Sequence, residues 1–344
     1  MESSGYHPSG EDLRQAKERI KPYVLMTPLL RAEALERGGR RVYLKPENLQ
    51  RTGSFKVRGA FNALTSLPQE VRQKGVITYS SGNHGSAMAF AARELGLAET
   101  GAPYPCTVVV PERISPAKLA RIQSYGAELV HAGTTVEDRK AKAEELGAAG
   151  GREVIPSYDD SRIICGQGTI GAETMDQWMG MPSRTRRLYM VAGPVGGGGL
   201  MAGISASLRA RGFGGRIVGI EPEDANDTQQ SFAKGERVSI PSPMTICDGL
   251  RSTTPGKLTF PIMKKCLEGI VAVSDEQVLA AVTWLMAEMK LLVEPSGAVA
   301  VAAYMNGLLD NPSHDPASPD HAGDVVLVIS GGNVDPKTVL GWIK

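Results

Sequence analysis

Four consecutive glycines, Gly196–Gly199, limit what this chain can fold into more than any other feature. The apolar run Leu188–Ala192 before them predicts a strand, and the segment from Leu200 onward predicts a helix. Glycines in a row leave backbone N–H groups unshielded, and the following helix points its N-terminus at the same place. The pattern predicts a nest for an anion such as phosphate, although its spacing matches neither GxGxxG nor a P-loop. The alternative is a flexible turn that binds nothing.

Strands and helices alternate along the rest of the chain. Short apolar runs predict strands at Val76–Tyr79, Cys106–Val110, Glu128–His131, Leu188–Ala192, Ile217–Glu221 and Val325–Ile329. Helices are predicted over Ser86–Gly96, with Gly96 as the C-cap, and over Pro116–Tyr125, Val136–Leu146 and Ser274–Leu291, the last with a capping box of Ser274 and Gln277. This rhythm predicts an α/β fold of parallel sheets with crossover helices.

Three of the predicted strands end in polar or glycine-rich turns. These turns are Ser80–Gly85, Gly193–Gly199 and Ser330–Asn333. Ligands of open parallel sheets bind beyond the carboxyl ends of the strands, so we expect the three turns to meet in one cleft. With 344 residues, the chain is long enough for one large domain or two smaller ones.

Composition and charge exclude several classes of protein. The net charge of +1 offers no field that would attract nucleic acid or an anionic membrane. The four cysteines are widely spaced and include no CxxC pair, which favours free thiols in a reducing compartment. The N-terminus has no apolar signal segment, and no apolar run approaches the ~20 residues that span a bilayer. We expect a cytoplasmic protein that binds neither nucleic acid nor membranes.

Lys56 lies just inside a predicted helix, and the motifs around it point to a function. Such a lysine is usually a solvated surface charge. However, SFKVRGA, SSGNHG, GPVGGGG, EPSGAVA and SGGNVD follow one another in this order. Together they resemble the fold-type II enzymes that use pyridoxal 5′-phosphate (PLP), and they are most similar to the serine racemase and serine/threonine dehydratase branch. The resemblance runs from Lys45 to Asp335.

The resemblance implies a set of residues that bind the cofactor. Lys56 corresponds to the residue that carries PLP covalently and, once substrate has displaced it, removes the α-proton on one face. The remaining cofactor contacts are Phe55 against the ring, Asn83 on the 3′-hydroxyl, Gly196, Gly197, Gly198, Gly199 and Leu200 around the phosphate, and Ser330 facing the pyridine nitrogen. An aspartate facing that nitrogen would keep it protonated, as transamination prefers. A neutral hydroxyl favours elimination and proton exchange; the alternative for Ser330 is a simple turn residue.

The resemblance also implies residues that contact the substrate. Ser80, Ser81, Asn83 and His84 lie in the turn that holds the substrate carboxylate, and Arg139 and Ser252 align with positions near the substrate. For His84, a neutral structural imidazole is an equal alternative. Arg139 could bind a second carboxylate, which keeps aspartate and 3-hydroxyaspartate open as substrates; otherwise it is a solvated helix residue.

Ser81 separates the two reactions that this branch performs. In serine racemases a serine at this motif position acts on the α-carbon face opposite the lysine, whereas many dedicated dehydratases have alanine there. Lys56 and Ser81 would then supply the two faces that racemisation needs. Loss of the β-hydroxyl from the same carbanion-like state yields pyruvate and ammonia, so both reactions are expected from one site.

An acidic loop after the strand Ile217–Glu221 resembles the divalent-cation loop of the racemases. The carboxylates of Glu221 and Asp227 and the carbonyl of Ala225 would bind Mg²⁺ or Ca²⁺, which take oxygen ligands. Glu223 and Asp224 make the loop more acidic than in the family, and an acidic surface turn is the alternative.

The resemblance finally implies a domain arrangement and partners. We expect a large domain of residues 1–74 and 158–344, an inserted small domain of residues 75–157, PLP in the cleft between them, and a homodimer. Thr52, Lys290 and Asn333 lie in motifs that line a nucleotide site in animal racemases, so ATP is a candidate activator.

The sequence thus predicts a PLP-dependent serine racemase that also eliminates water from serine. A dedicated ammonia-lyase for L-threonine, L-serine or 3-hydroxyaspartate is the first alternative. A PLP-binding or nucleotide-binding regulator without turnover is the second, against which Lys56 argues.

Overall fold

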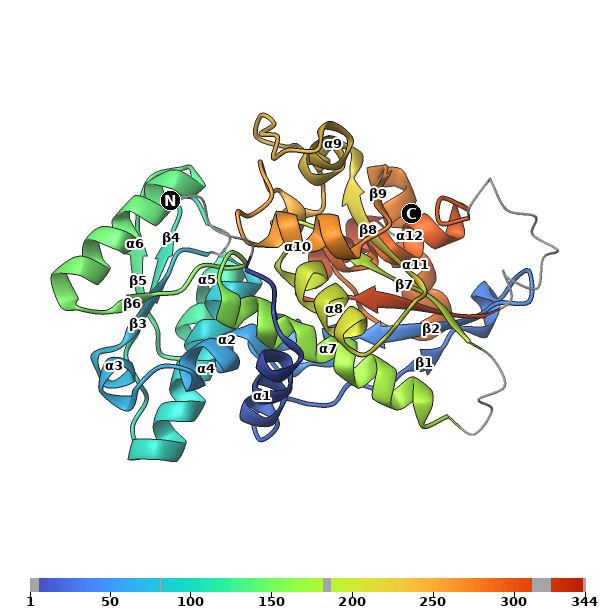
Figure 1. The fold of residues 1–344 in the computed structure, drawn as a ribbon. Helices are drawn as coiled ribbons and strands as arrows, with labels where there is room; N and C mark the ends of the chain where they lie inside the picture. The colour runs from blue at the N-terminus through green and yellow to red at the C-terminus, as the bar shows by residue number, and fades with distance from the viewer. Residues whose placement is uncertain (1–5, 81, 115, 182–186, 311–322, 343–344) are drawn as a thin grey trace.

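The computed structural model describes residues 6–80, 82–114, 116–181, 187–310 and 323–342. In this part of the chain the strands form two separate sheets, one at each end of the molecule, with helices on both faces (Figure 1). The prediction of an α/β fold built on parallel sheets is confirmed.

The larger sheet has six strands, of which only the edge strand β1 is antiparallel to its neighbour. Their order is β1 (Leu30–Arg31), β2 (Arg41–Pro46), β10 (Asp324–Ile329), β7 (Leu188–Pro194), β8 (Arg216–Pro222) and β9 (Gly269–Val273). The carboxyl ends of β2, β10 and β7 therefore lie along one edge of the sheet, and the segments that follow them begin there.

The smaller sheet is wholly parallel and has four strands. Their order is β5 (Glu128–His131), β4 (Cys106–Val110), β3 (Val76–Thr78) and β6 (Glu153–Val154). Buried residues of β3 and β4 alternate between two apolar clusters, so both faces of this sheet are covered as well.

The helices pack against the two sheets and connect their strands. They are α1 (Gly10–Ile20), α2 (Lys56–Thr65), α3 (Gln69–Lys74), α4 (Asn83–Thr100), α5 (Pro116–Gln123), α6 (Val136–Gly150), α7 (Ser161–Met179), α8 (Gly199–Ala210), α9 (Asp227–Lys234), α10 (Thr259–Cys266), α11 (Asp275–Met289), α12 (Pro295–Met305) and α13 (Pro336–Trp342), with short 3-10 turns η1 (Glu33–Leu35), η2 (Glu47–Leu49), η3 (Arg51–Gly53), η4 (Glu223–Ala225) and η5 (Asp248–Leu250). Among the described residues, no helix is both long and apolar enough to cross a bilayer.

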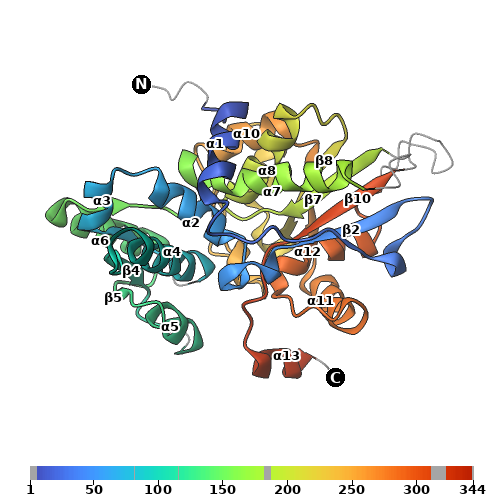
Figure 2. The same ribbon diagram turned by 90° about the horizontal axis from the view of Figure 1, so that it is seen from below.

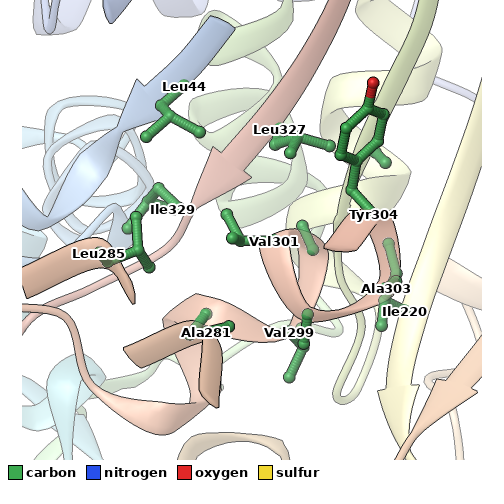
Figure 3. Packing of buried hydrophobic residues seen from close by; sticks show 14 of the residues in the cluster. Leu44, Ile220, Ala281, Leu285, Val299, Val301, Ala303, Tyr304, Leu327 and Ile329 are labelled. Carbon is green, nitrogen blue, oxygen red and sulfur yellow. The ribbon is translucent and has the colours of Figure 1, made fainter. Parts of the chain in front are cut away.

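The core of the larger unit consists of two apolar layers, one on each face of the six-stranded sheet. Along β10, Val325, Leu327 and Ile329 face α11 and α12, whereas Val326 and Val328 face α7 and α8. Figure 2 shows these helix pairs on opposite sides of the strands, and Figure 3 shows Leu327 and Ile329 pointing toward α12 and its neighbour α11. Because both faces are buried, β10 is a continuous apolar run rather than an alternating one.

The predicted strands are confirmed to within two residues at either end, but several helix ends differ. The prediction that Gly96 caps a helix is wrong, because α4 begins at Asn83, continues through Gly96 and ends at Gly101, whose φ is 78°. A Cβ on residue 96 would lie 2.2 Å from the Tyr104 backbone nitrogen, so this glycine allows a close backbone approach.

Three further helices also end at other residues than predicted. Helix α5 stops at Gln123 rather than Tyr125, and α6 extends past Leu146 to Gly150. Helix α11 keeps the predicted capping box of Ser274 and Gln277 but ends at Met289. Sequence patterns locate helix interiors better than helix ends, because tertiary contacts decide where the last turn stops.

Buried charges tie the start of α2 to β2 and α7. Arg58 donates to Glu47 and Glu173 at 2.7 Å each, and Lys45 donates to Glu173 at 3.0 Å and to the Thr27 carbonyl at 2.7 Å. Arg58, Lys45 and Glu47 are fully buried. Two cations and two carboxylates compensate one another here, which is the condition for keeping charges out of water.

Replacing Arg58 with methionine should therefore lower the free energy of unfolding by about 3–5 kcal/mol, because two buried carboxylates lose their main partner. Urea unfolding of the cofactor-free protein followed by circular dichroism measures this change. Arg14→Met, which breaks only the exposed pair with Glu11, should leave the unfolding midpoint unchanged. Equal effects of the two substitutions would contradict a central role for the buried network.

Candidate active site

Lys56 begins α2, and its amino group meets the segment after β6 of the smaller sheet, in the region of the predicted cleft. Its Nζ donates to the carbonyl oxygen of Ser157 at 2.8 Å. Burial lowers the pKa of Lys56 to about 8, although the charge of Glu294 opposes this shift. Near neutral pH an appreciable fraction of this amine is therefore uncharged and nucleophilic.

The backbone before Lys56 is anchored to the end of β10. The Phe55 N–H donates to the Ser330 carbonyl at 3.1 Å, and Ser54 forms an isolated antiparallel bridge with Gly331. The Phe55 ring lies 5.1 Å from the Lys56 amino nitrogen, measured to the ring centroid. The turn after β10 therefore holds the start of α2 in place, as expected if these segments share one cleft.

The glycine loop lies at the N-terminus of α8, directly after β7. Within the described part of the chain, the N–H groups of Gly196–Leu200 have no hydrogen-bond acceptor, and the N-cap residue Gly198 has a φ of 92°. Unpaired amides at a helix N-terminus form a site for an anion. The loop can therefore hold a phosphate group, as the sequence suggested.

Tyr158 covers this loop, and packing explains much of its glycine content. A Cβ on Gly197 would lie 2.4 Å from the Tyr158 ring, and one on Gly199 would lie 2.9 Å from the Tyr158 Cβ. A Cβ on Gly198 would lie 2.5 Å from the methyl carbon of Met263. Since Ser157 accepts from Lys56, residues 157 and 158 join the lysine to the glycine loop.

A chain of amides crosses the cleft from the smaller to the larger unit. Asn333 Nδ2 donates to the Thr52 carbonyl at 2.8 Å and to Asn83 Oδ1 at 2.7 Å. Asn83 Nδ2 in turn donates to Glu294 Oε1 at 2.7 Å. Asn83 begins α4, whereas Glu294 precedes α12, so the predicted meeting of the SSGNHG and SGGNVD turns is observed.

The SSGNHG motif is not a simple turn, because helix α4 begins at its Asn83. Ser80 follows β3 and accepts the Gly82 N–H at 3.4 Å, and His84 lies in the first turn of α4. Burial and the nearby Lys56 lower the pKa of His84 to about 3, so its imidazole is neutral. Ser81 lies outside the described residues.

Arg139 and Ser252 lie on different units. Arg139, in the second turn of α6, is partly buried; its Nη1 donates weakly to the Thr134 carbonyl at 3.4 Å, and its Nε has no acceptor among the described residues. Ser252 follows η5 and lies beside Tyr158 and Asp227, and its hydroxyl donates to the Thr254 carbonyl at 2.9 Å. No hydrogen bond joins Arg139 to Ser252 in the described ranges.

The acidic loop after β8 contains two buried carboxylates. Glu221 accepts the N–H groups of Thr228 and Gln229 at 3.1 and 2.8 Å, whereas both carboxylate oxygens of Asp227 lack a partner among the described residues. Burial raises the pKa of Asp227 to about 7, and burial together with Asp227 raises that of Glu221. Two buried acids of this kind must share a proton or bind a cation. Ala225, in η4 between them, is also buried.

This loop does not contain a larger group of ligands. In the described ranges, no three His, Cys, Asp or Glu side chains are clustered as metal ligands. A cation here would therefore need backbone carbonyls and water besides the two carboxylates, as the predicted Ala225 carbonyl would supply.

Two of the three predicted nucleotide contacts lie together. Asn333 is bonded to the carbonyl of Thr52, a residue with the unusual φ of 63°. Lys290 ends α11 in a left-handed conformation and donates to the Ala287 carbonyl. In the described part of the chain, no hydrogen bond joins Lys290 to the other two residues.

Comparison with known proteins decides the family. The chain matches the family described as "Pyridoxal-phosphate dependent enzyme" over residues 20–331. The chain belongs to this PLP-dependent family.

Relatives named for different activities have similar sequence identity to this chain. An L-threo-3-hydroxyaspartate ammonia-lyase of Saccharomyces cerevisiae is 38% identical, covering 96% of this chain and 94% of the relative. A serine racemase of Dictyostelium discoideum is 36% identical, covering 96% of each. The structure of maize serine racemase superposes with a TM-score of 0.87 at 32% identity, covering 98% of this chain and 97% of the other. Fold-type II architecture and PLP dependence are thus established.

The residues around the cleft fit PLP. The free amides of Gly196–Leu200 suit its phosphate, the Lys56 amine suits its aldehyde, and one N–H of Asn83 remains for a hydroxyl beyond the one given to Glu294. Ser330 is buried and its hydroxyl is 3.4 Å from the Ser296 carbonyl, so it presents a neutral group.

Two polar residues of the site had no role in the sequence interpretation. Glu294 stands first in the EPSGAVA motif, which could have drawn attention to it. Tyr158 stands where the resemblance to animal racemases leads one to expect asparagine, but its position over the glycine loop depends on a contact between distant segments.

Gly197→Ala should weaken PLP binding, because the new methyl group must displace the Tyr158 ring or the loop itself. Fluorescence titration of cofactor-free protein with PLP gives the dissociation constant. The double variant Gly197→Ala, Tyr158→Ala should recover part of the loss, since it removes the clashing ring. No recovery would mean that the glycine is needed for the ligand alone.

Proposed function

We propose that this enzyme is a serine racemase that interconverts L- and D-serine and also eliminates water from serine to give pyruvate and ammonia. The observation that carries the proposal is the Lys56 amine, held by the Ser157 carbonyl beside the free amides of the glycine loop. The similarity to serine racemases supports it.

Each residue of the cleft has a task in this proposal. Bound PLP supplies the electron sink that stabilises negative charge on the substrate α-carbon. Lys56 takes the α-proton on one face, helped by a pKa of about 8 that leaves part of the amine neutral. Ser81 serves the opposite face by resemblance. The amides of Gly196–Leu200 hold the phosphate.

The substrate carboxylate needs donors that carry no competing charge. Ser80 and the first-turn amides of α4 meet this need, since a helix N-terminus attracts anions. His84 is neutral and buried, so we assign it a packing role rather than proton transfer. Ser252, next to Tyr158, borders the cleft on the side of the acidic loop.

A second candidate is β-elimination from 3-hydroxyaspartate by a dedicated ammonia-lyase. The observation that favours it is Arg139, whose partly buried guanidinium keeps an Nε without an acceptor among the described residues. A guanidinium in that state suits a second carboxylate on the substrate. The similarity to an L-threo-3-hydroxyaspartate ammonia-lyase supports this alternative. L-threonine is a further substrate to test.

We also propose that Glu221, Asp227 and the Ala225 carbonyl bind Mg²⁺ or Ca²⁺. The unpartnered Asp227 carboxylate supports this, because a buried acid without donors is stabilised by a cation. Activation by ATP at Thr52, Lys290 and Asn333 stays a prediction from the resemblance.

A cytoplasmic homodimer whose domains divide at residues 75–157 is part of the same proposal. Exposed apolar side chains support a subunit interface: Leu25, Met26, Leu49 and Leu292 are 42–68% exposed. The Leu25 amide bonds to Gln50 and the Leu292 carbonyl to Asn48, so these residues surround one segment.

Purified enzyme with PLP and Mg²⁺ should convert L-serine into D-serine and pyruvate, measured by chiral chromatography and a coupled assay. Ser81→Ala should still form pyruvate but no D-serine, because only one face keeps its proton donor. Pyruvate alone from the wild type would favour the lyase, to be tested with L-threonine and 3-hydroxyaspartate. In that case Arg139→Gln should lower kcat/KM for 3-hydroxyaspartate about tenfold or more while sparing serine.

Mg²⁺ should raise the melting temperature of the wild type at pH 8, and this gain should shrink as the pH falls to 6. Protons compete with the cation for Asp227, whose pKa burial raises to about 7. Differential scanning fluorimetry with and without Mg²⁺ measures the effect. Asp227→Asn should abolish it, whereas Asp224→Asn, at an exposed position of the same loop, should not. Loss in the Asp224 variant would mean that the ligands are misassigned.

A further inference from the structure

Glu294 is a buried carboxylate in the cleft to which the proposed chemistry gives no task. It is 5% exposed, and its Oε1 accepts from Asn83 Nδ2 at 2.7 Å. A Cβ on Gly331 would lie 2.3 Å from the same oxygen, so the turn after β10 closes over the carboxylate. The Glu294 N–H also donates to the Gly331 carbonyl at 3.1 Å, and Gly331 pairs with Ser54, two residues before Lys56. The side chain is therefore enclosed beside the segment that leads into Lys56.

The hydrogen bonds around Glu294 determine which of its oxygens can carry a proton. The Thr52 carbonyl can only accept, so the amide nitrogen of Asn333 must face it. Asn333 then donates to Asn83 Oδ1, which directs Asn83 Nδ2 at Glu294 Oε1. Because Oε1 is an acceptor in this chain, a proton on Glu294 resides on Oε2.

Charges from several elements face Glu294. They are Lys56 of α2, Lys118 and Arg121 of α5, and Asp248 of η5, whereas the Cys247 thiol before η5 is neutral because burial raises its pKa to about 12. Burial raises the pKa of Glu294 to about 7, and Asp248 adds to the rise, whereas Asn83, Lys118 and Arg121 oppose it. Glu294 in turn raises the pKa of Lys56.

We propose that Glu294 is a positioning residue for Lys56: its carboxylate stabilises the protonated amine, and it becomes a neutral acid when the amine is uncharged. The proposal deepens the proposed function and rests on it only in taking Lys56 as the amine that binds PLP. The pair keeps the site close to electrically neutral whichever group holds the proton, which is favourable in a buried cleft.

The contact between the two units influences this pair. Lys118 of α5, in the smaller unit, forms an ion pair with Asp248 of η5, in the larger unit. The positive charge of Lys118 reaches Glu294 only while α5 lies against η5.

The test is the pH dependence of PLP capture by the cofactor-free enzyme. Capture forms a bond between neutral Lys56 Nζ and the aldehyde carbon of PLP and releases water, so its rate follows the uncharged fraction of the amine. Stopped-flow absorbance gives the midpoint of this pH profile. Glu294→Gln keeps an acceptor for Asn83 but removes the charge, so the midpoint should fall by on the order of one pH unit.

An unchanged midpoint in Glu294→Gln would overturn the proposal, because a residue that only anchors Asn83 is replaced well by glutamine. A second variant decides the matter if Glu294→Gln fails to fold. Lys118→Met lets Glu294 become neutral at higher pH, so it should lower the midpoint in the same direction by a smaller amount. Lys142→Met is the control, since the side chains of Lys118 and Lys142 are 40% and 35% exposed and both are ion-paired with a carboxylate. Equal midpoints in these two variants would overturn the proposal.

Capture is followed without substrate, so it is independent of the reaction proposed above. A wild type that captures PLP but makes neither D-serine nor pyruvate overturns the proposed reaction, and the midpoints still decide the role of Glu294. A wild type that captures no PLP overturns both.

Discussion

The compensation of charge around Arg58 is the constraint on which the rest of the site depends. Arg58 stands two residues after Lys56 and is held by carboxylates from η2 and α7. Because leaving any of these charges unpaired inside the protein is costly, the first turn of α2 has little freedom to shift. Lys56 is thereby fixed to β2 and α7, the frame of the larger unit, while its amino group donates to the Ser157 carbonyl.

Several helices begin at this cleft, which explains why it suits anions. The N-termini of α2, α4, α8 and α12 lie at Lys56, Asn83, Gly199 and Pro295, and the contacts of these segments join them around one space. Unpaired N–H groups and aligned helix dipoles favour a phosphate and a substrate carboxylate there. The neutral groups His84 and Ser330 add no competing charge. The cleft thus combines anion-binding backbone with one amine whose pKa is lowered by burial.

The choice among the reactions of this family depends on few side chains, since relatives named for different activities have similar sequence identity to this chain. In the proposed reactions, proton delivery to the second face would depend on Ser81, and acceptance of a second carboxylate would depend on Arg139. Protonation of Lys56 depends on Glu294 and, through Lys118, on how the two units meet. Fold and cofactor are common to all these reactions, so the side chains around the α-carbon decide the product.

The sequence by itself predicted six of the ten described strands, the cofactor, and Lys56 as the amine that binds it. Apolar runs such as Val325–Ile329 and ordered motifs such as SFKVRGA are local, and local patterns can be read without knowing what lies opposite. Only the tertiary structure decided the tasks of Glu294, Tyr158 and Gly96. Asn83 and Glu294 are 211 residues apart, and Gly96 is explained by the chain packed against it, not by its helix. The charge state of a buried group depends on its neighbours in space, and a single sequence does not specify those neighbours.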